Sequence, residues 1–396
     1  MKIGFVSTWF ERGAAYVTKQ YAELLKKHNH EISIYARGES YAIGNPKWDT
    51  PNVTWGKKLY DTTLDINDVS KWIEKNGIEC IFFNEQRDMV SVLKIREKYP
   101  HVKLGTYIDY YTQGTVEDFD YYDFLICNTK RHYSVFSKHK QCFYVPWGTD
   151  IELFKPIPND KDRLTFFHSA GMSTRKGTDV LIRAFIKGKV YEKADLVVHT
   201  QIPISELTEY KEAELADYNI TVIQKTVTAP GLYYLGDVYV YPTTLDGLGL
   251  TMYEALACGL PVIATDCAPM NEVVNDGVGR LIKVDSFKCR WDAYYWPLAF
   301  VEEQSLVECM MYYVDNYDKI DSLKRLARES AEKNWNWFER GEQVNNAFEN
   351  SVVLDWDMPR IKDAIAKYKS KDKKSLIKAL IPFLPHWVQQ VYFRNR

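Results

Sequence analysis

The sequence of 396 residues contains no apolar run that approaches the roughly 18 residues typical of a membrane-spanning helix. No secretory leader is expected, because Met1-Lys2 leads directly into a short strand-like run. The seven cysteines are scattered and odd in number, and none forms a Cys-x2-Cys pair. Small buried thiols are therefore expected in place of disulfides or zinc ligands, which predicts a reducing, cytosolic environment.

Common cofactor and metal motifs are also missing. No Gly-x-Gly-x-x-Gly follows the first predicted strand, and no Walker sequence occurs. The eight histidines show no His-x3-His spacing. Asp118-Phe-Asp120 and Asp355-Trp-Asp357 fit the Asp-x-Asp pattern that holds a divalent ion in many enzymes, but neither follows a strand near the Gly-rich turn described below. We therefore predict neither a metal nor a cofactor.

Short strand-like runs alternate with helical periods along the chain, which is typical of parallel α/β layers. The content of 46% hydrophobic and 26% charged residues suits a globular protein long enough for two domains. Helical spacing is clearest over residues 16–27, and Phe154-Lys-Pro-Ile-Pro158 predicts a hinge because prolines interrupt helices and central strands. The predicted strands cover residues 3–7, 31–36, 80–83, 104–108, 123–127 and 142–145, then 164–169, 196–200, 220–223, 238–241, 262–264 and 279–282.

The most informative segment begins where the predicted strand 238–241 meets a Gly-rich turn that opens into a helix. Gly247 and Gly249 have no Cβ to keep a ligand from the backbone, so N–H groups and the helix N-terminus can face a diphosphate. Asp246 and Glu254 add acceptors that suit the hydroxyls of a sugar or a ribose. The alternative is an ordinary strand-turn-helix in which the acidic residues cap the helix or face solvent.

This segment resembles a known family. Asp246 and Glu254, with seven residues between them, resemble the acidic pair, usually Glu-x7-Glu, of the family 4 glycosyltransferases, which are retaining enzymes of GT-B architecture. Residues 167–185 resemble the segment that opens the C-terminal domain of that family, and residues 145–156 resemble its interdomain linker. Residues 1–8, followed by Gly13, resemble its first strand and loop.

The resemblance implies an α/β protein of GT-B fold, with two facing Rossmann-like domains and a cleft between them. It implies an N-terminal acceptor domain over residues 1–155, a nucleotide-sugar domain over 156–334, and a crossover helix with a basic tail over 335–396. The implied activity is metal-independent, retaining transfer of a hexose to a saccharide or lipid-linked acceptor in glycan or surface polysaccharide assembly. We rank a UDP-sugar first and GDP-mannose second as donor. A catalytically silent GT-B subunit that binds a nucleotide sugar or acts as a scaffold is the alternative.

Two residues that the family usually carries are replaced. Lys176 falls on the lysine that contacts the donor diphosphate, but Ala170-Gly171-Met172 stands where relatives have Gly-Arg-Leu, so Arg175, Lys225 or another basic residue is a candidate substitute. The histidine that contacts the donor sugar is also missing, and Asp109 either takes that role or caps a turn. The catalytic candidates are Lys176, Asp246, Arg175 and Asp109, and the donor-binding candidates are Gly13, Lys176, Thr226, Asp246, Gly247, Leu248, Gly249, Leu250 and Glu254.

Two further segments have open interpretations. Residues 361–396 contain nine Lys or Arg against two Asp, so this segment carries +7 while the whole chain is −2. Its apolar residues either dock on the N-terminal domain or join the basic residues on an anionic membrane surface, which would place the protein on the inner face of the membrane. Nucleic acid is not an expected partner. The five aromatic residues within 291–300 either close a core or stack on an acceptor.

Overall fold

The computed structural model describes residues 1–37, 42–158 and 162–380, with side chains up to residue 370. It divides by internal contacts into two compact units. The first comprises residues 1–106, 118–124 and 350–396, and the second comprises residues 107–117 and 125–349. This division follows contacts alone, so the domain boundaries expected from the sequence remain a prediction.

The first seven strands form one sheet in the order β3-β2-β1-β4-β5-β6-β7. The sheet is built from β1 (Lys2–Ser7), β2 (Glu31–Ala36), β3 (Val53–Trp55), β4 (Cys80–Phe83), β5 (Lys103–Tyr107), β6 (Phe124–Cys127) and β7 (Cys142–Tyr144). The pairing of β1 with β2 and β4 is parallel. The strands β4, β5 and β6 are buried along their whole length, which explains the continuous apolar sequences of β4 and β6.

Helices connect these strands, as expected for parallel pairing. They are α1 (Gly13–Lys27), α2 (Ile66–Asn76), α3 (Met89–Lys98) and α4 (Lys130–Phe136). The carboxylates of Asp65 and Asp88 accept N–H groups in the first turns of α2 and α3, so both helices begin at a capping residue. In α1 the side chains of Val17, Tyr21 and Leu25 are buried at helical spacing.

The second sheet has the order β10-β9-β8-β11-β12-β13. Its strands are β8 (Thr165–Gly171), β9 (Asp195–Thr200), β10 (Ile220–Gln224), β11 (Val238–Tyr241), β12 (Val262–Thr265) and β13 (Gly279–Ile282), and their pairs are parallel. The chain runs outward from β8 in one direction and from β11 in the other. The boundary between β8 and β11 is therefore the topological switch point, where ligands bind in open α/β sheets.

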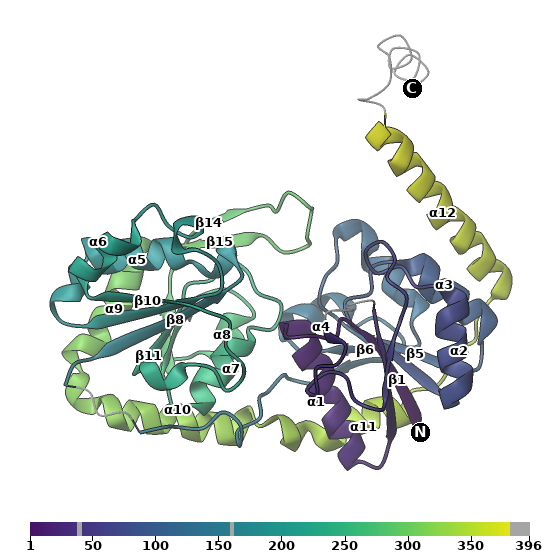
Figure 1. The fold of residues 1–396 in the computed structure, drawn as a ribbon, viewed down its shortest axis with the longest axis horizontal. Helices are drawn as coiled ribbons and strands as arrows, with labels where there is room; N and C mark the ends of the chain where they lie inside the picture. Colours follow the sequence, from purple (N-terminus) through teal and green to yellow (C-terminus); the bar gives the residue numbers. More distant parts are fainter. Residues whose placement is uncertain (38–41, 159–161, 381–396) are drawn as a thin grey trace, which may run out of the picture. The chain divides into compact units, whose positions relative to one another are not determined.

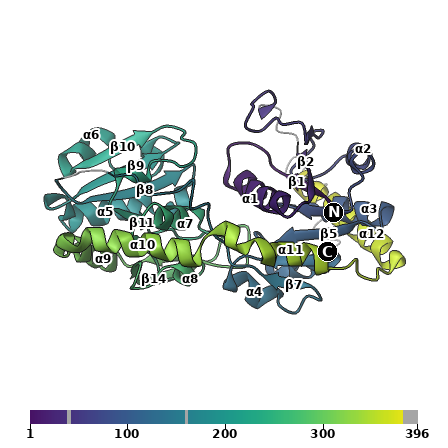
Figure 2. The ribbon, with the colours of Figure 1, turned by 90° about the horizontal axis from the view of Figure 1, so that it is seen from below.

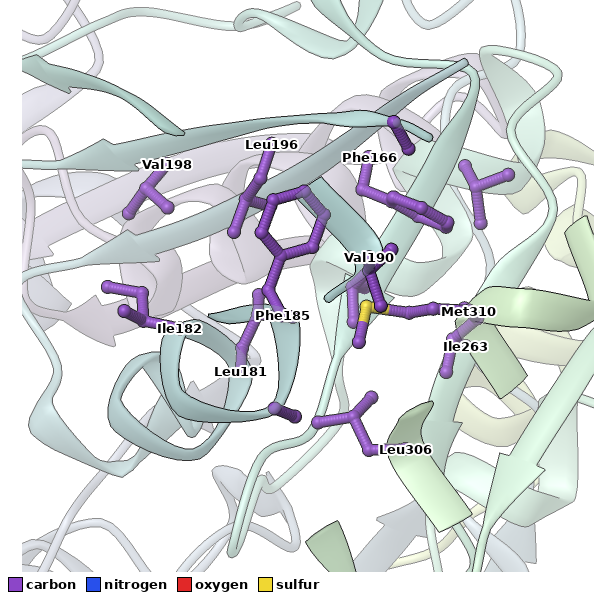
Figure 3. Packing of buried hydrophobic residues seen from close by; sticks show 14 of the residues in the cluster. Phe166, Leu181, Ile182, Phe185, Val190, Leu196, Val198, Ile263, Leu306 and Met310 are labelled. Atoms are coloured by element: carbon purple, nitrogen blue, oxygen red, sulfur yellow. The ribbon is translucent and has the colours of Figure 1, made fainter. Parts of the chain in front are cut away.

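Helices cover both faces of this second sheet. They are α5 (Thr178–Lys187), α6 (Glu212–Leu215), α7 (Leu250–Ala257), α8 (Met270–Val273), α9 (Glu303–Asp315) and α10 (Ile320–Asn334). A further helix, α11 (Gly341–Asn350), follows α10 in the chain. Helix α5 packs beside α9, and α7 packs beside α10 (Figure 2). An apolar core lies between the sheet and α5 and α9, with Phe166, Phe185 and Met310 interleaved (Figure 3). This core fixes β8 and α5, and with them the turn that joins them.

A separate hairpin follows β13. It consists of the antiparallel strands β14 (Val284–Lys288) and β15 (Leu298–Val301), and the N–H group of Ala299 in β15 donates to the Thr244 carbonyl at 2.8 Å. At the tip, the Tyr294 side chain is buried, whereas Trp291 is 96% exposed. Tyr294 therefore closes a core, as one of the two interpretations expects, whereas stacking of the exposed Trp291 on an acceptor stays a prediction.

The basic C-terminal segment begins by packing within the first unit. Helix α12 (Met358–Leu380) contacts α3 through a small core in which Ile361 and Ile365 meet Leu93 (Figure 1). This contact is the one that the docking interpretation predicts for the start of the segment. The part of the segment from 381 to 396, which the membrane interpretation also uses, lies outside the described residues.

A buried carboxylate holds the chain that leads into α12. Asp123 pairs with Arg96, and both side chains are inaccessible to solvent. The second carboxylate oxygen of Asp123 accepts the Leu354 N–H and the Trp356 indole N–H, each at 2.9 Å. Every one of these contacts joins segments of the first unit that are distant in sequence.

Candidate functional site

Lys176 and Asp246 come together at the switch point of the second sheet. Lys176 ends a short 3-10 turn after β8, and Asp246 lies in the turn after β11. Because β8 and β11 are parallel neighbours, the loops that follow them leave from the same edge of the sheet. Gly177 makes this approach possible, since a Cβ there would lie 2.1 Å from the Pro242 carbonyl oxygen. Its φ of +76° also suits glycine.

The two charged residues form a cluster with Tyr241, the last residue of β11. Lys176 Nζ donates to Tyr241 Oη at 2.6 Å and forms an ion pair with the Asp246 carboxylate. Tyr241 Oη in turn donates to the same carboxylate. The side chains of Lys176 and Asp246 are each 19% exposed, so the cluster lies at the surface of a mostly buried site.

The cluster keeps the Asp246 carboxylate ionised. Burial alone would raise its pKa, but the Lys176 ammonium and the hydrogen bonds from Lys176, Tyr241 and the Gly249 N–H outweigh burial and hold the pKa well below its usual range. Burial and the neighbouring Asp246 raise the pKa of Tyr241 well above its usual value, so the phenol stays a donor. A cation and an acceptor thus stand side by side, as binding of a phosphate next to a sugar hydroxyl requires.

The turn after Asp246 is open and preorganised. Gly249 adopts a φ of +73° and precedes α7, and its N–H donates to Asp246 Oδ1 at 2.9 Å. A Cβ placed at Gly247 would meet no atom within 4 Å, which shows that the backbone faces free space there. Together with the positive end of the α7 helix dipole, this surface suits an anion.

Glu254 lies one turn into α7 and accepts a hydrogen bond from Tyr233 Oη. Burial raises the pKa of the Glu254 carboxyl to about 7, against the opposing effects of the Tyr233 hydrogen bond and the Lys176 charge. Hydroxyl donors that approach this carboxyl would favour its ionised form. The role predicted for Glu254 beside a ribose stays a prediction.

The other predicted residues are less closely tied to the cluster. Arg175 is exposed, and its carbonyl accepts the Thr244 N–H at 2.9 Å, while its guanidinium has no partner among the described residues. Thr226 is exposed in the segment after β10. The Asp109 carbonyl accepts from Tyr294 Oη at 3.1 Å, and Gly13 begins α1 in the first unit. The roles predicted for these four residues stay predictions.

Three contributors to the site were not predicted. Tyr241 bridges Lys176 and Asp246, and Tyr233 holds Glu254. The guanidinium of Arg131, on α4, donates to the Asp246 carbonyl. The position of Tyr241 directly before the turn was a signal that the sequence offered, whereas nothing near Arg131 in the sequence points to Asp246.

The Asp-x-Asp segments have other partners. Asp118 accepts a hydrogen bond from Tyr368 Oη, and the Asp357 carbonyl accepts the Ile361 N–H at 3.0 Å at the start of α12. Within the part of the chain that the structure describes, no three His, Cys, Asp or Glu side chains gather in a way that could hold a metal ion. Metal independence stays a prediction.

Comparison with known proteins shows what the segment around this site is similar to. Residues 163–289 match the family model described as glycosyl transferases group 1, and these residues contain Lys176, Asp246 and Glu254. HepE from Anabaena, solved in complex with UDP-glucose, superimposes with a TM-score of 0.68 over 88% of this chain and 100% of its own, at 16% identity. The chain has the GT-B fold, and its residues 163–289 are similar to the glycosyl transferases of group 1.

Two curated relatives of this GT-B protein are similar over shorter stretches. A lipopolysaccharide core biosynthesis mannosyltransferase of Rhizobium meliloti is 39% identical over 104 residues, which is 25% of this chain and 28% of the relative. A GDP-mannose-dependent alpha-(1-6)-phosphatidylinositol monomannoside mannosyltransferase of Mycolicibacterium smegmatis is 27% identical over 169 residues, which is 37% of this chain and 44% of the relative. The GT-B protein thus spans less than half of the length of either relative.

The fold expected from the sequence is confirmed, since the GT-B protein contains two parallel, Rossmann-like sheets. The family resemblance drawn from Asp246 and Glu254 is confirmed as well. No helix in the described part of the chain has the length and apolar character that a bilayer span needs.

Proposed function

We propose that this protein is a retaining glycosyltransferase that moves a hexose from a nucleoside diphosphate sugar to a saccharide or lipid-linked acceptor. The observation that carries the proposal is the Lys176, Tyr241 and Asp246 cluster at the switch point, beside an open glycine turn and Glu254. The cation and the turn N–H groups suit a diphosphate, Asp246 suits sugar hydroxyls and Glu254 suits the ribose.

The proposed chemistry needs no base from the protein. The bond between the anomeric carbon and the diphosphate oxygen breaks as the acceptor hydroxyl oxygen bonds to the same face of the carbon. The acceptor proton passes to the departing phosphate oxygen. Lys176 stabilises the negative charge that develops on the diphosphate, which is the usual source of a large rate effect in such sites.

The names of the two curated relatives favour mannose as the transferred sugar, which raises GDP-mannose above the UDP-sugar that was ranked first from the sequence alone. The test is slow hydrolysis of a panel of GDP-, UDP- and dTDP-sugars, followed by the release of nucleoside diphosphate. We expect release from GDP-mannose or from a UDP-sugar, with the anomeric configuration of the freed sugar retained. A protein that binds GDP or UDP but hydrolyses no donor and transfers to no acceptor would support the catalytically silent subunit instead. A protein that binds no nucleotide would overturn the proposal.

A further inference from the structure

The start of α4 is hydrogen-bonded to the turn formed by residues 246–249, here called the donor turn. Arg131 is 5% exposed, and its guanidinium donates to the carbonyl oxygens of Asp246 and Ala268. Its own backbone N–H donates to Glu272 Oε1 at 2.8 Å, and the Lys130 N–H donates to Glu272 Oε2 at 2.6 Å. The two carbonyls therefore fix the guanidinium of Arg131, and the Glu272 carboxylate fixes its backbone.

The hydrogen bond from Arg131 determines the orientation of the peptide group between Asp246 and Gly247. In a trans peptide the C=O of one residue and the N–H of the next point in opposite directions. Because Arg131 holds the Asp246 carbonyl, the Gly247 N–H points away from Arg131. No atom would lie within 4 Å of a Cβ at Gly247, so the backbone borders open space. The Asp246 side chain is anchored separately by Lys176 and by the Gly249 N–H, which keeps the rest of the turn in place.

His132, the next residue on α4, also contacts the donor turn. His132 is fully buried, its ring lies against the backbone of Gly247, and its Nδ1 is 3.1 Å from Tyr111 Oη. Burial first, and then the charge of Arg131, lower the pKa of His132 well below its usual value, so the ring is neutral. Trp296 Nε1 donates to the same Tyr111 Oη at 2.6 Å. Arg131 is thus the single positive charge among these groups, and His132 packs beside it without a competing charge.

We infer that Arg131 is a positioning residue that directs the Gly247 N–H toward the distal phosphate of a bound nucleoside diphosphate. The inference rests on the proposed function, in which Asp246 lies toward the sugar and Glu254 toward the ribose. Gly247 follows Asp246 directly, so its N–H lies at the sugar end of the diphosphate, where the distal phosphate sits. An N–H group that already points toward the phosphate needs no rearrangement when the nucleotide binds. Fixed N–H groups therefore bind anions more tightly than mobile ones.

The test compares nucleotides that differ only by the distal phosphate. Arg131→Met frees the Asp246 carbonyl, so the affinity for GDP and UDP should fall by about tenfold or more, the value of one hydrogen bond to a charged group. The affinity for GMP and UMP, which lack that phosphate, should change by less than about threefold. Arg131→Lys keeps the charge but cannot span two carbonyls as the planar guanidinium does, so its loss for the diphosphates should be intermediate.

Arg328 offers a matched control. Its guanidinium also binds backbone carbonyls, those of Ile151, Phe154 and Ala257 at 3.0, 2.9 and 2.7 Å, but none in the donor turn. Arg328→Met should lower the melting temperature and leave the ratio of diphosphate to monophosphate affinity unchanged. Isothermal titration calorimetry on the full chain measures all of these affinities.

Each outcome decides the inference. If Arg131→Met and Arg131→Lys keep the wild-type ratio of diphosphate to monophosphate affinity, or lose both nucleotides equally, Arg131 does not orient the Gly247 N–H. If Arg131→Met does not fold, the ratio measured on Arg131→Lys alone decides the question. If the wild-type protein binds neither GDP nor UDP, the proposed function fails and the inference fails with it. A selective loss of diphosphate affinity with intact monophosphate binding supports the inference.

Discussion

Nucleotide binding should release a proton from Glu254. In the free protein, burial raises the pKa of this carboxyl to about 7. Ribose hydroxyls donate to the carboxylate and favour its ionised form, so the pKa falls on binding. At pH 6 the free protein holds about 0.9 proton on Glu254, and most of it should be released, whereas at pH 8 the release should be about 0.1. The nucleotide affinity contributed by Glu254 should therefore rise about tenfold between pH 6 and pH 8.

Calorimetry in two buffers with different ionisation enthalpies measures the number of protons released. The terminal phosphate of the nucleotide itself titrates near pH 6, so the wild type must be compared with Glu254→Gln, which keeps the shape of the side chain but cannot ionise. The difference between the two proteins isolates Glu254. Equal proton release and equal pH dependence in both proteins would show that Glu254 does not meet the ribose.

The same carboxyl affects stability in the absence of nucleotide. Because the folded pKa lies above the ordinary value of 4.5, the folded state binds more protons than the unfolded state between pH 4.5 and 7. The free energy of unfolding should therefore fall as the pH rises through this window, by about 1–3 kcal/mol for a carboxyl that keeps some contact with solvent. Glu254→Gln should remove this part of the pH dependence in urea denaturation.

Further predictions concern the cluster, metals and the C-terminal segment. Lys176→Ala should lower turnover about 10²-fold or more, and the free energy of unfolding should fall by about 1–3 kcal/mol because Asp246 loses its cation; unchanged turnover would remove Lys176 from the mechanism. Asp246→Asn should spare GDP and UDP affinity and reduce transfer, and an equal loss of both would place Asp246 elsewhere. Activity should survive excess EDTA, and a strict need for Mn²⁺ or Mg²⁺ would refute metal independence. Deleting residues 361–396 should lower the melting temperature through loss of the Ile361 contact with α3, whereas a fold that melts unchanged but no longer binds anionic liposomes at low salt would favour the membrane role.

Much of the fold was accessible from the sequence because parallel strands buried on both faces are continuous apolar runs. The predicted strands 31–36, 80–83, 238–241 and 279–282 match β2, β4, β11 and β13 at both ends. The strand β3 was missed, since its three residues are only partly buried and give no such run. The hairpin of β14 and β15 was missed as well, because β14 is partly exposed along its length and gives no apolar run.

The site was predictable where its chemistry is local. Asp246, Gly247, Gly249 and Glu254 follow one strand within a single turn and helix, so their proximity is fixed by secondary structure. Lys176 required the further assumption that the loops after β8 and β11 meet, which the resemblance supplied. Arg131 could not be found in this way, because its contact with the Asp246 carbonyl depends on tertiary packing and a backbone oxygen carries no sequence signal.

The first unit cannot complete the buried contacts of Asp123 until the segment that contains Leu354 and Trp356 is present. The buried pair of Arg96 and Asp123 receives two of its hydrogen bonds from Leu354 and Trp356, so the first unit stays incomplete until synthesis has passed residues 125–349 and reached Trp356. During that time a charged pair and the apolar side chain of Leu93 lack their native cover, which is the kind of exposed surface that chaperones bind. Translation that stops before Leu354 leaves this surface open.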